Sequence, residues 1–404
     1  MARLNLRQIR VILLAAAFLL LAGGIGYSLG SQQLKVNFDR AAGVKIERTL
    51  PAAHANLDFS LFWEVWDRLA ANYLDKGAIK PAQMIYGAIQ GMTAALGDPY
   101  TVFLPPTENK QTKDDLNGAF EGVGIQLGYD KDENLIVVSP LKDLPAAKAG
   151  IKAGDLILKI DTKETTGVSL PEAVSLIRGP AGTKVRLTLR HEEEQNAFEK
   201  ELIREAIVVS SVEVSFVDKV AVLKLSRFGE RTDEEWNKGI DEVINHQPGV
   251  SGLILDLRNN PGGYLSGSIF TAAEFLNSGV VVQQEQANGQ RESFAVERKG
   301  KLINLPVVVL INKGSASAAE ILAGALQEHK RARVVGEKSF GKGTIQEAQE
   351  LTGGAGLHIT TARWLLPSGK SIDKNGITPD VEVKDDPATT IDEQLEKAKE
   401  MLLK

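Results

Sequence analysis

The chain has 404 residues, a net charge of −5 at pH 7 and no cysteine. Its length accommodates two or three domains. The acidic balance, with no basic patch interleaved with aromatic residues, argues against nucleic acid as a partner. The absence of cysteine excludes disulfide frameworks, thiolate metal sites and cysteine nucleophiles. The five histidines show no metal-ligand spacing, so no metal site is expected.

Residues 1–31 predict a basic cytoplasmic end followed by a membrane anchor. Residues 11–30 form an uncharged, mostly apolar run that is about long enough to span a bilayer as a helix. Arginines precede this run, which places the N-terminus in the cytoplasm and the rest of the chain outside it. A cleaved signal peptide is the alternative, and it would make the protein secreted or periplasmic.

A polar tether is expected at residues 32–55 and a helical segment at residues 56–116. Apolar residues recur there at helical spacing until Gly97-Asp-Pro-Tyr100 ends the pattern. The first stripe of this segment is aromatic. We expect it to pack in a core, with a dimer contact as the alternative. Its members are Phe59, Phe62, Trp63, Trp66 and Leu69.

Residues 117–205 predict a small domain of short strands and two short helices. The segment begins with the glycine-framed loop Gly122-Val123-Gly124-Ile125. Glycines allow backbone N–H groups to converge on an anion, because no side chain intervenes. A plain tight turn is the alternative. Strands are predicted at residues 135–139, 156–160 and 184–190, and helices at residues 145–149 and 170–177.

Residues 206–386 alternate between strand and helix patterns, which is typical of an α/β sheet. A C-terminal helix is expected at residues 387–404. Loops at the carboxyl ends of such strands usually build the site. One of them holds Pro261-Gly-Gly263, and the N–H of Gly262 or Gly263 could face a substrate there; a simple turn is the alternative. Strands are predicted at residues 220–225, 252–258, 306–311 and 332–336, and helices at residues 233–245, 266–276 and 318–327.

The turn Asn312-Lys-Gly-Ser-Ala-Ser-Ala-Ala-Glu320 joins a strand to a helix. At a helix start the first N–H groups lack partners and the helix dipole favours negative charge, so an oxyanion beside Ser317 would meet donors such as the N–H of Ala318. Ser317 and Glu320 also have the spacing of a capping box. The serine could be a nucleophile or a helix cap, and the two roles need not compete, since a serine at a helix start is already beside the donors that its oxyanion requires.

Lys342 lies between Gly341 and Gly343, just after a predicted strand. Glycines let other groups approach closely, so the ammonium could be buried and its pKa lowered. Such a lysine could accept a serine proton near neutral pH. A surface lysine in a glycine turn is the alternative.

Two other chemistries fit the sequence less well. The stretch from Gly336 to Lys342 matches most of a phosphate-binding P-loop, but Gly343 stands where that motif needs Ser or Thr. A Ser-His-Asp triad stays formally open, because triads are defined by geometry, with His246 or His329 as the histidine to test.

Two sets of motifs resemble known families. Ala149-Gly-Ile-Lys-Ala-Gly-Asp155 and Arg178-Gly-Pro-Ala-Gly182 resemble a PDZ domain. Asp256-Leu-Arg-Asn-Asn-Pro-Gly-Gly263, Gly314-Ser-Ala-Ser-Ala-Ala-Glu320 and Phe340-Gly-Lys-Gly-Thr-Ile-Gln346 resemble the C-terminal processing peptidases. The resemblance implies an α/β and α+β multidomain protein: a helical segment, a PDZ domain and a serine protease core of the ClpP/crotonase-like type.

This resemblance also implies roles for individual residues. Ser317 would be the nucleophile and Lys342 the base, completed by Gln346, while Ser315 would be only a neighbour. In an extended strand Lys342 and Gln346 lie roughly 13 Å apart, so their contact needs a compact backbone at Gly343. The implied oxyanion donors are Ala318 and Gly262 or Gly263. The implied peptide-binding residues are Gly122, Val123, Gly124, Ile125 and Arg178.

The expected function is therefore that of a membrane-anchored serine endopeptidase. It would bind the free C-terminus of extracytoplasmic protein substrates through its PDZ domain and cut them without a cofactor. A catalytically silent PDZ adaptor or holdase is the alternative, and a homo-oligomer is left open.

Overall fold

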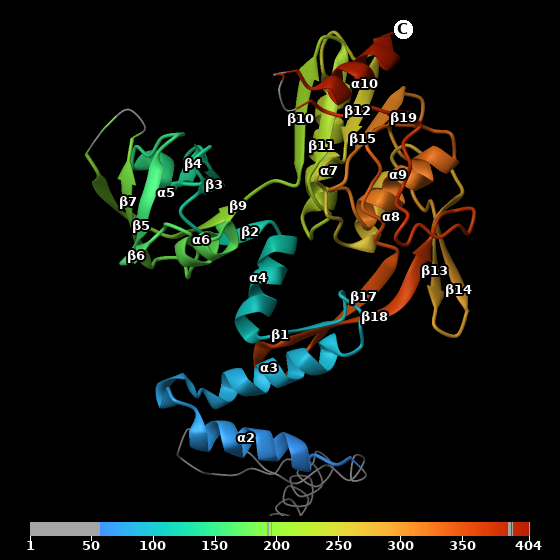
Figure 1. The fold of residues 1–404 in the computed structure, drawn as a ribbon. Helices are drawn as coiled ribbons and strands as arrows, with labels where there is room; N and C mark the ends of the chain where they lie inside the picture. Colours follow the sequence, from blue (N-terminus) through green and yellow to red (C-terminus); the bar gives the residue numbers. More distant parts are fainter. Residues whose placement is uncertain (1–56, 192–193, 195, 387–388, 390, 404) are drawn as a thin grey trace, which may run out of the picture. The chain divides into compact units, whose positions relative to one another are not determined.

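The computed structural model of the chain describes residues 57–191, 194, 196–386, 389 and 391–403 (Figure 1). They divide into two compact units, one up to Ile85 and the other from Tyr86 onward. The predicted anchor at residues 11–30 and nearly all of the tether lie outside the described residues. No helix within the described ranges is both long enough and apolar enough to span a membrane.

The first unit contains α2 (Ser60–Asn72), η2 (Lys76–Ala78) and the start of α3 (Pro81–Ala94). The expectation that the aromatic stripe packs in a core is wrong for the described residues, because no residue of α2 is buried. Its rings pack on one another instead, with the centroids of Phe62 and Trp63 5.0 Å apart. The alternative of a dimer contact stays a prediction.

The PDZ-like domain is an antiparallel sheet in the order β3-β4-β5-β7-β8, with β6 beside β5. Alternate residues of β7 (Lys184–Arg190), including Leu187 and Leu189, are fully buried in its core. A two-stranded ribbon of β2 (Ala119–Gly122) and β9 (Glu205–Val208) joins the ends of this domain. The other elements are β3 (Ile125–Tyr129), β4 (Leu135–Pro140), α5 (Pro145–Lys148), β5 (Leu156–Ile160), β6 (Lys163–Glu164), α6 (Leu170–Ile177) and β8 (Phe198–Ile203).

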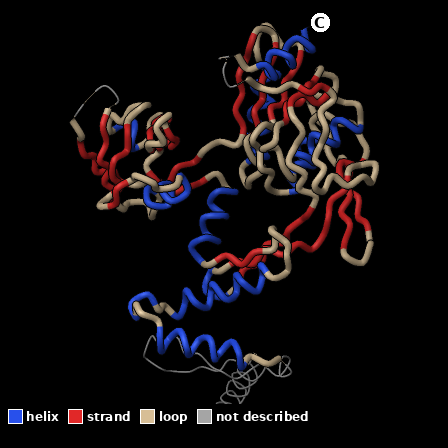
Figure 2. Tube along the Cα trace, in the orientation of Figure 1, coloured by secondary structure: helices blue, strands red, loops and turns tan. Residues whose placement is uncertain are grey.

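The core domain has a six-stranded sheet in the order β10-β11-β12-β15-β16-β19. The first pair is antiparallel and the other pairs are parallel. Helices follow β11, β12 and β15 as predicted, whereas β13 and β14 stand between α8 and β15 and were not predicted. Figure 2 shows the strands and helices of the chain in separate colours. The elements are β10 (Val212–Val217), β11 (Val220–Leu225), α7 (Thr232–Asn245), β12 (Gly252–Asp256), α8 (Leu265–Ala272), β15 (Val307–Ile311), α9 (Ala318–Glu328), β16 (Arg333–Gly336) and β19 (Val381–Glu382).

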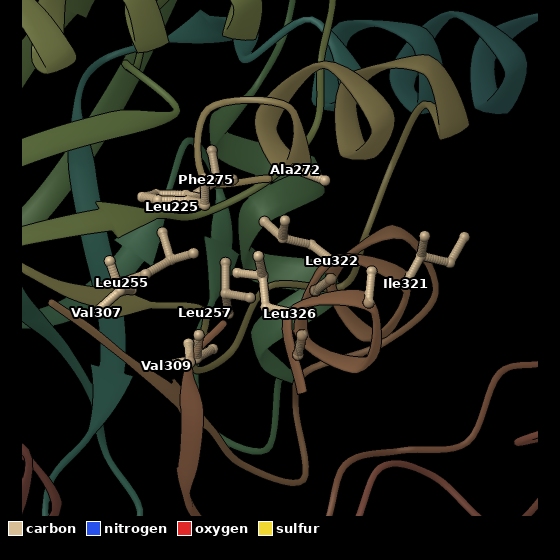
Figure 3. Packing of buried hydrophobic residues seen from close by; sticks show 14 of the residues in the cluster. Leu225, Leu255, Leu257, Ala272, Phe275, Val307, Val309, Ile321, Leu322 and Leu326 are labelled. Carbon is tan, nitrogen blue, oxygen red and sulfur yellow. The ribbon is translucent and has the colours of Figure 1, made fainter. Parts of the chain in front are cut away.

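Helices cover both faces of this sheet, which explains why β15 is apolar at every position. Val307 and Val309 face the cluster that includes Leu322 of α9 (Figure 3). Val308 and Leu310 face the opposite cluster, to which α10 (Glu393–Leu403) contributes Ala398. Within the residues expected to form a C-terminal helix, 387–404, the structure has a helix from Glu393 to Leu403, and this helix covers the second face.

A second sheet has the order β1-β18-β13-β14, and β17 also pairs with β18. β1 (Val102–Leu104) lies within the region expected to be helical, so that expectation is wrong at this point. Its pairing partner, β18 (Gly356–Leu365), lies some 250 residues away in the sequence, beyond the reach of local patterns. The remaining elements are α4 (Pro106–Leu116), β13 (Val280–Gln286), β14 (Arg291–Ala295), β17 (Thr344–Glu350) and η3 (Thr352–Gly354).

Candidate active site

The loops that follow the parallel strands meet at the carboxyl edge of the core sheet, where α/β proteins usually build their sites. Together with α4, β17 and β18 they line a pocket of about 510 Å³. Every catalytic and oxyanion residue predicted from the sequence lines it: Gly262, Gly263, Ser317, Ala318, Lys342 and Gln346. Asp115, Leu116, His358 and Trp364 line the same pocket and were not predicted.

Ser317 lies at the start of α9 in a backbone conformation that is rare for residues other than glycine. Its φ is 53° and its ψ is −118°. Strain of this kind persists only where the surroundings impose it, and it clusters at functional sites. The N–H of Ser317 donates to Glu320 Oε2 over 2.8 Å. The capping glutamate is therefore in place while Ser317 still lines the pocket, so capping does not exclude a catalytic role.

Ser315 has a different role from Ser317. Its side chain is fully buried. Its Oγ donates to the carbonyl of Leu257 over 2.8 Å and accepts from the N–H of Asn312 over 3.0 Å. These bonds join the serine turn to the loop after β12. Ser315 is thus a neighbour that shapes the turn, as expected.

The two predicted oxyanion glycines differ in what their N–H groups contact. The N–H of Gly262 donates to Asn260 Oδ1 over 2.8 Å, so it is already occupied. Within the described residues, the N–H groups of Gly263 and Ala318 have no acceptor. Gly262 still has to be glycine, because a Cβ there would lie 2.7 Å from that of Ser317. The pair that can receive an oxyanion is therefore Gly263 and Ala318.

The loop after β12 that carries these glycines is fixed by Arg258. Its guanidinium binds both carboxylate oxygens of Asp256 and both carboxylate oxygens of Asp392. Bidentate pairs of this kind are strong and directional. Asp392 immediately precedes α10, so the C-terminal helix is tied to the loop that borders the pocket.

Lys342 is held by its main chain at two points. Its N–H donates to Glu320 Oε2 over 2.9 Å, and its carbonyl accepts from Trp364 Nε1 over 2.8 Å. Both flanking glycines are required by close packing, since a Cβ on Gly343 would lie 2.8 Å from the Cα of Asp373. Lys342 is therefore not a surface lysine in a loose turn.

The side chain of Lys342 is half-buried, and burial lowers its pKa below the ordinary value. The negative charges of Asp98 and Glu320 act against this shift. Its Nζ lies 4.9 Å from the ring centroid of Tyr100. Among the hydrogen bonds of the described residues, none joins Lys342 Nζ to Ser317 Oγ.

Glu320 connects the turn that contains Ser317 to the loop that contains Lys342. The sequence indicated only that Glu320 has the spacing of a capping-box residue. Its side chain is fully buried. Besides Ser317 and Lys342, it accepts from the N–H of Gly341 over 2.7 Å and from Ser339 Oγ over 2.5 Å. Burial raises its pKa, and these hydrogen bonds oppose that shift. The carboxylate fixes the relative positions of Ser317 and Lys342.

Gln346 lines the pocket, but its amide nitrogen donates to Thr344 Oγ1 over 2.9 Å and to Thr360 Oγ1 over 3.1 Å. Among the hydrogen bonds of the described residues, none joins Gln346 to Lys342, and the register of β17 against β18 shifts between Ile345 and Gln346. Such a bulge re-aims side chains at the edge of a site.

Neither His246 nor His329, the two candidates for a triad histidine, lines the pocket. His246 stacks on Phe216, with 3.6 Å between centroids, and His329 Nε2 contacts the carbonyl of Val280. His358 of β18 lines the pocket instead. Burial lowers its pKa, and the charge of Lys342 lowers it further. Its position could not be read from sequence, because it depends on the pairing of β18.

The predicted peptide-binding loop connects β2 to β3. The carbonyls of Val123 and Gly124 accept from Ala146 and Leu141, over 2.9 Å each. The N–H groups of Val123 and Gly124 have no acceptor in the described part of the chain. Gly124 has a φ of 75°, which favours glycine. The loop therefore offers free donors, as a carboxylate site requires.

Arg178 ends α6, close to this loop. Its guanidinium lies 4.9 Å from the ring centroid of Phe120 and forms an ion pair with Asp115 at 2.9 Å. Asp115 belongs to α4 and lines the pocket that contains Ser317. A chain of contacts thus runs from the PDZ-like domain to the candidate active site.

Comparison with known proteins identifies the family to which the chain belongs. The chain matches peptidase family S41 over residues 219–383 and a PDZ domain over residues 136–191. A carboxy-terminal-processing protease of Bartonella bacilliformis is 38% identical over 330 residues, which cover 80% of this chain and 74% of that protein. The chain belongs to peptidase family S41. It is therefore a serine peptidase of the carboxy-terminal processing type.

Other relatives agree with this assignment. A carboxyl-terminal-processing protease of Synechocystis sp. is 36% identical over 372 residues, which cover 91% of this chain and 86% of that protein. Among solved structures, the photosystem II D1 C-terminal processing protease is 30% identical, with a TM-score of 0.51. That similarity covers 85% of this chain and 96% of the other. The resemblance noted in the sequence is thus confirmed, and the silent adaptor is not favoured.

Proposed function

We propose that this S41 peptidase is an endopeptidase that binds the C-terminal tail of a protein substrate and cuts it with Ser317 and Lys342. The observation that carries the proposal is the convergence of Ser317, Lys342 and the free N–H groups of Gly263 and Ala318 on one pocket. These are the parts that acyl transfer needs: a nucleophile, a base and oxyanion donors.

In the proposed reaction, neutral Lys342 accepts the proton of Ser317 as Oγ attacks the scissile carbonyl carbon. The N–H groups of Gly263 and Ala318 hold the resulting oxyanion. Lys342 then gives the proton to the leaving amine, and the acyl-enzyme forms. Water hydrolyses this ester by the same route, with Lys342 again accepting the proton. Gln346 would orient the lysine only after leaving Thr344 and Thr360.

The proposed tail site is the loop Gly122-Val123-Gly124-Ile125. Free backbone donors there would bind the terminal carboxylate, and the peptide would extend along the exposed edge of β3. A carboxylate could also attract Arg178 away from Asp115, which would report the bound tail to the pocket through α4. The substrates would be extracytoplasmic if residues 11–30 anchor the chain in a membrane.

Two substitutions test the chemistry. Ser317→Ala and Lys342→Met should each abolish cleavage of an unstructured polypeptide while leaving the binding of a tail peptide intact. His329→Ala serves as the control and should retain activity, since His329 lies outside the pocket. If Lys342→Met cuts as well as the wild type, the proposed base is wrong.

A second test addresses the tail. The full chain, in detergent, is incubated with one unstructured polypeptide that ends in either a free or an amidated C-terminus. We expect the free form to be cut faster, because an amide lacks the charge that the loop binds. Equal rates for both would contradict tail recognition and leave the chemistry of Ser317 and Lys342 untouched.

A further inference from the structure

The ammonium of Lys342 lies against an aromatic ring, not against the serine. Its Nζ is 4.9 Å from the centroid of Tyr100, within the range of a cation–π contact. Tyr100 closes the turn Gly97-Asp-Pro-Tyr100 that ends the helical apolar pattern, and the sequence indicated no function for it. The charged or titratable groups around this pair come from several elements: Asp98 before β1, Glu320 of α9, His358 of β18 and Asp373 beyond β18.

The backbone that carries Tyr100 is held by hydrogen bonds to its neighbours. The N–H of Tyr100 donates to Asp98 Oδ1 over 3.0 Å, and Thr101 Oγ1 donates to Asp98 Oδ2 over 2.6 Å. The hydroxyl of Thr101 accepts from the N–H of Thr360 in β18 over 3.0 Å. β18 also pairs with β17, which begins two residues after Lys342. The same strand therefore fixes both partners.

This contact distinguishes the two protonation states of the lysine. The face of an aromatic ring attracts an ammonium, whereas a neutral amine gains little from it. Burial of Lys342 acts in the opposite direction, against the charged form. A base that accepts the Ser317 proton has to be neutral. Contact with the ring and catalysis therefore require different states of Lys342.

We propose that Tyr100 is a positioning residue that holds the protonated Lys342 side chain in the resting enzyme, and that Ser317 is activated only after the amine leaves this ring. The inference rests on the proposed role of Lys342 as the base. The ammonium loses its proton to solvent, the neutral amine is no longer attracted by the ring, and it becomes available to Ser317 Oγ. Tyr100 thereby sets the lower end of the working pH range.

The test is the pH dependence of kcat/KM for the full chain on an unstructured polypeptide. The acidic limb of that profile reports the pKa of the base in the free enzyme. Tyr100→Leu removes the ring and should shift the limb to lower pH by about 0.5 to 1.5 units. Tyr100→Phe keeps the ring and should leave the limb in place. Tyr86→Leu is the matched control, since Tyr86 packs on Phe103.

An unmoved limb in Tyr100→Leu, or an equal shift in Tyr100→Phe, overturns the proposal. If Tyr100→Leu does not fold, phenylalanines with increasing numbers of fluorine atoms at position 100 weaken the ring's attraction without changing its shape. The limb should then fall stepwise with fluorine content, and a constant limb contradicts the proposal. If Lys342→Met is active, both the proposed role of Lys342 as the base and the proposed role of Tyr100 are wrong. If Lys342→Met is inactive and the acidic limb of Tyr100→Leu does not move, only the proposed role of Tyr100 is wrong.

Discussion

The loop at Gly124 in the PDZ domain and the loop at Gly262 in the core both present backbone N–H groups from a glycine turn. They differ in what occupies the space where a Cβ would lie. At Gly124 it is Leu144, whose Cβ lies 2.6 Å and whose Cδ1 lies 2.7 Å away, whereas at Gly262 it is the Cβ of Ser317 together with backbone atoms of Ala316 and Ala318. The binding loop is therefore restrained by one side chain, while the catalytic loop is fixed to the backbone of the turn that carries its nucleophile.

The largest effect is expected from Gly262→Ala. The new Cβ would meet Ser317 Cβ and Ala318 N within 3.0 Å, so the serine and its oxyanion donor have to shift. Loss of oxyanion stabilisation costs about 10²- to 10³-fold in kcat. Single-turnover cleavage measures this change. Gly249→Ala is the matched control, with the same φ of 101° and open space around it. Comparable losses in both variants would refute the fixed-loop argument.

A smaller effect is expected from Gly124→Ala. This substitution should lower the affinity for the peptide tail without changing kcat. The alanine has to adopt a left-handed conformation and displace Leu144. Affinity for a free-tail peptide should fall about tenfold, which corresponds to about 1.4 kcal/mol. Isothermal titration measures it. Gly150→Ala, with a φ of 80° in open space of the same domain, controls for backbone strain. A fall in kcat at saturating substrate would show that the two loops are not independent.

Site residues that belong to local sequence patterns could be predicted, whereas those that depend on contacts between distant segments could not. The strand-to-helix turn at Ser317 and the glycine pair around Lys342 are local patterns, so both residues could be singled out from the sequence, and the structure brings both to one pocket. The second role of Glu320 was missed because its partners at Ser339 and Gly341 are brought near only by the folded sheet. Choosing Gly263 over Gly262 likewise requires the hydrogen bond from Gly262 to Asn260. The strand β1 was missed because its apolar residues are few and its partner is distant.

Lys342→Met should stabilise the protein at neutral pH, by a few degrees in Tm. The folded protein lowers the pKa of Lys342, so between this lowered pKa and the ordinary value of 10.5 the unfolded chain binds more protons. Wild-type stability therefore rises with pH across this window, and the advantage of the variant should shrink. Thermal melts at several pH values measure it. Lys338→Met, an exposed lysine of the same loop, should show no such trend.

The smallest effect is expected from Asp115→Asn, which frees Arg178 from its ion pair. Exposed pairs contribute little, so affinity for a free-tail peptide should rise only about two- to fivefold. Asp114→Asn is the control, because Asp114 lies on the same helix and pairs with Lys110. Tighter binding in both variants would mean that general loss of negative charge, and not release of Arg178, is responsible.

The clamp of Arg258 on Asp256 and Asp392 makes the pocket dependent on a part of the chain far from it in sequence. Arg258, in the loop that holds Gly262 and Gly263, binds Asp392, the residue that precedes α10. A nick between β19 and α10 would leave every catalytic group covalently in place yet loosen its support. Activity therefore depends on an ion pair that contains none of the groups that would take part in the reaction.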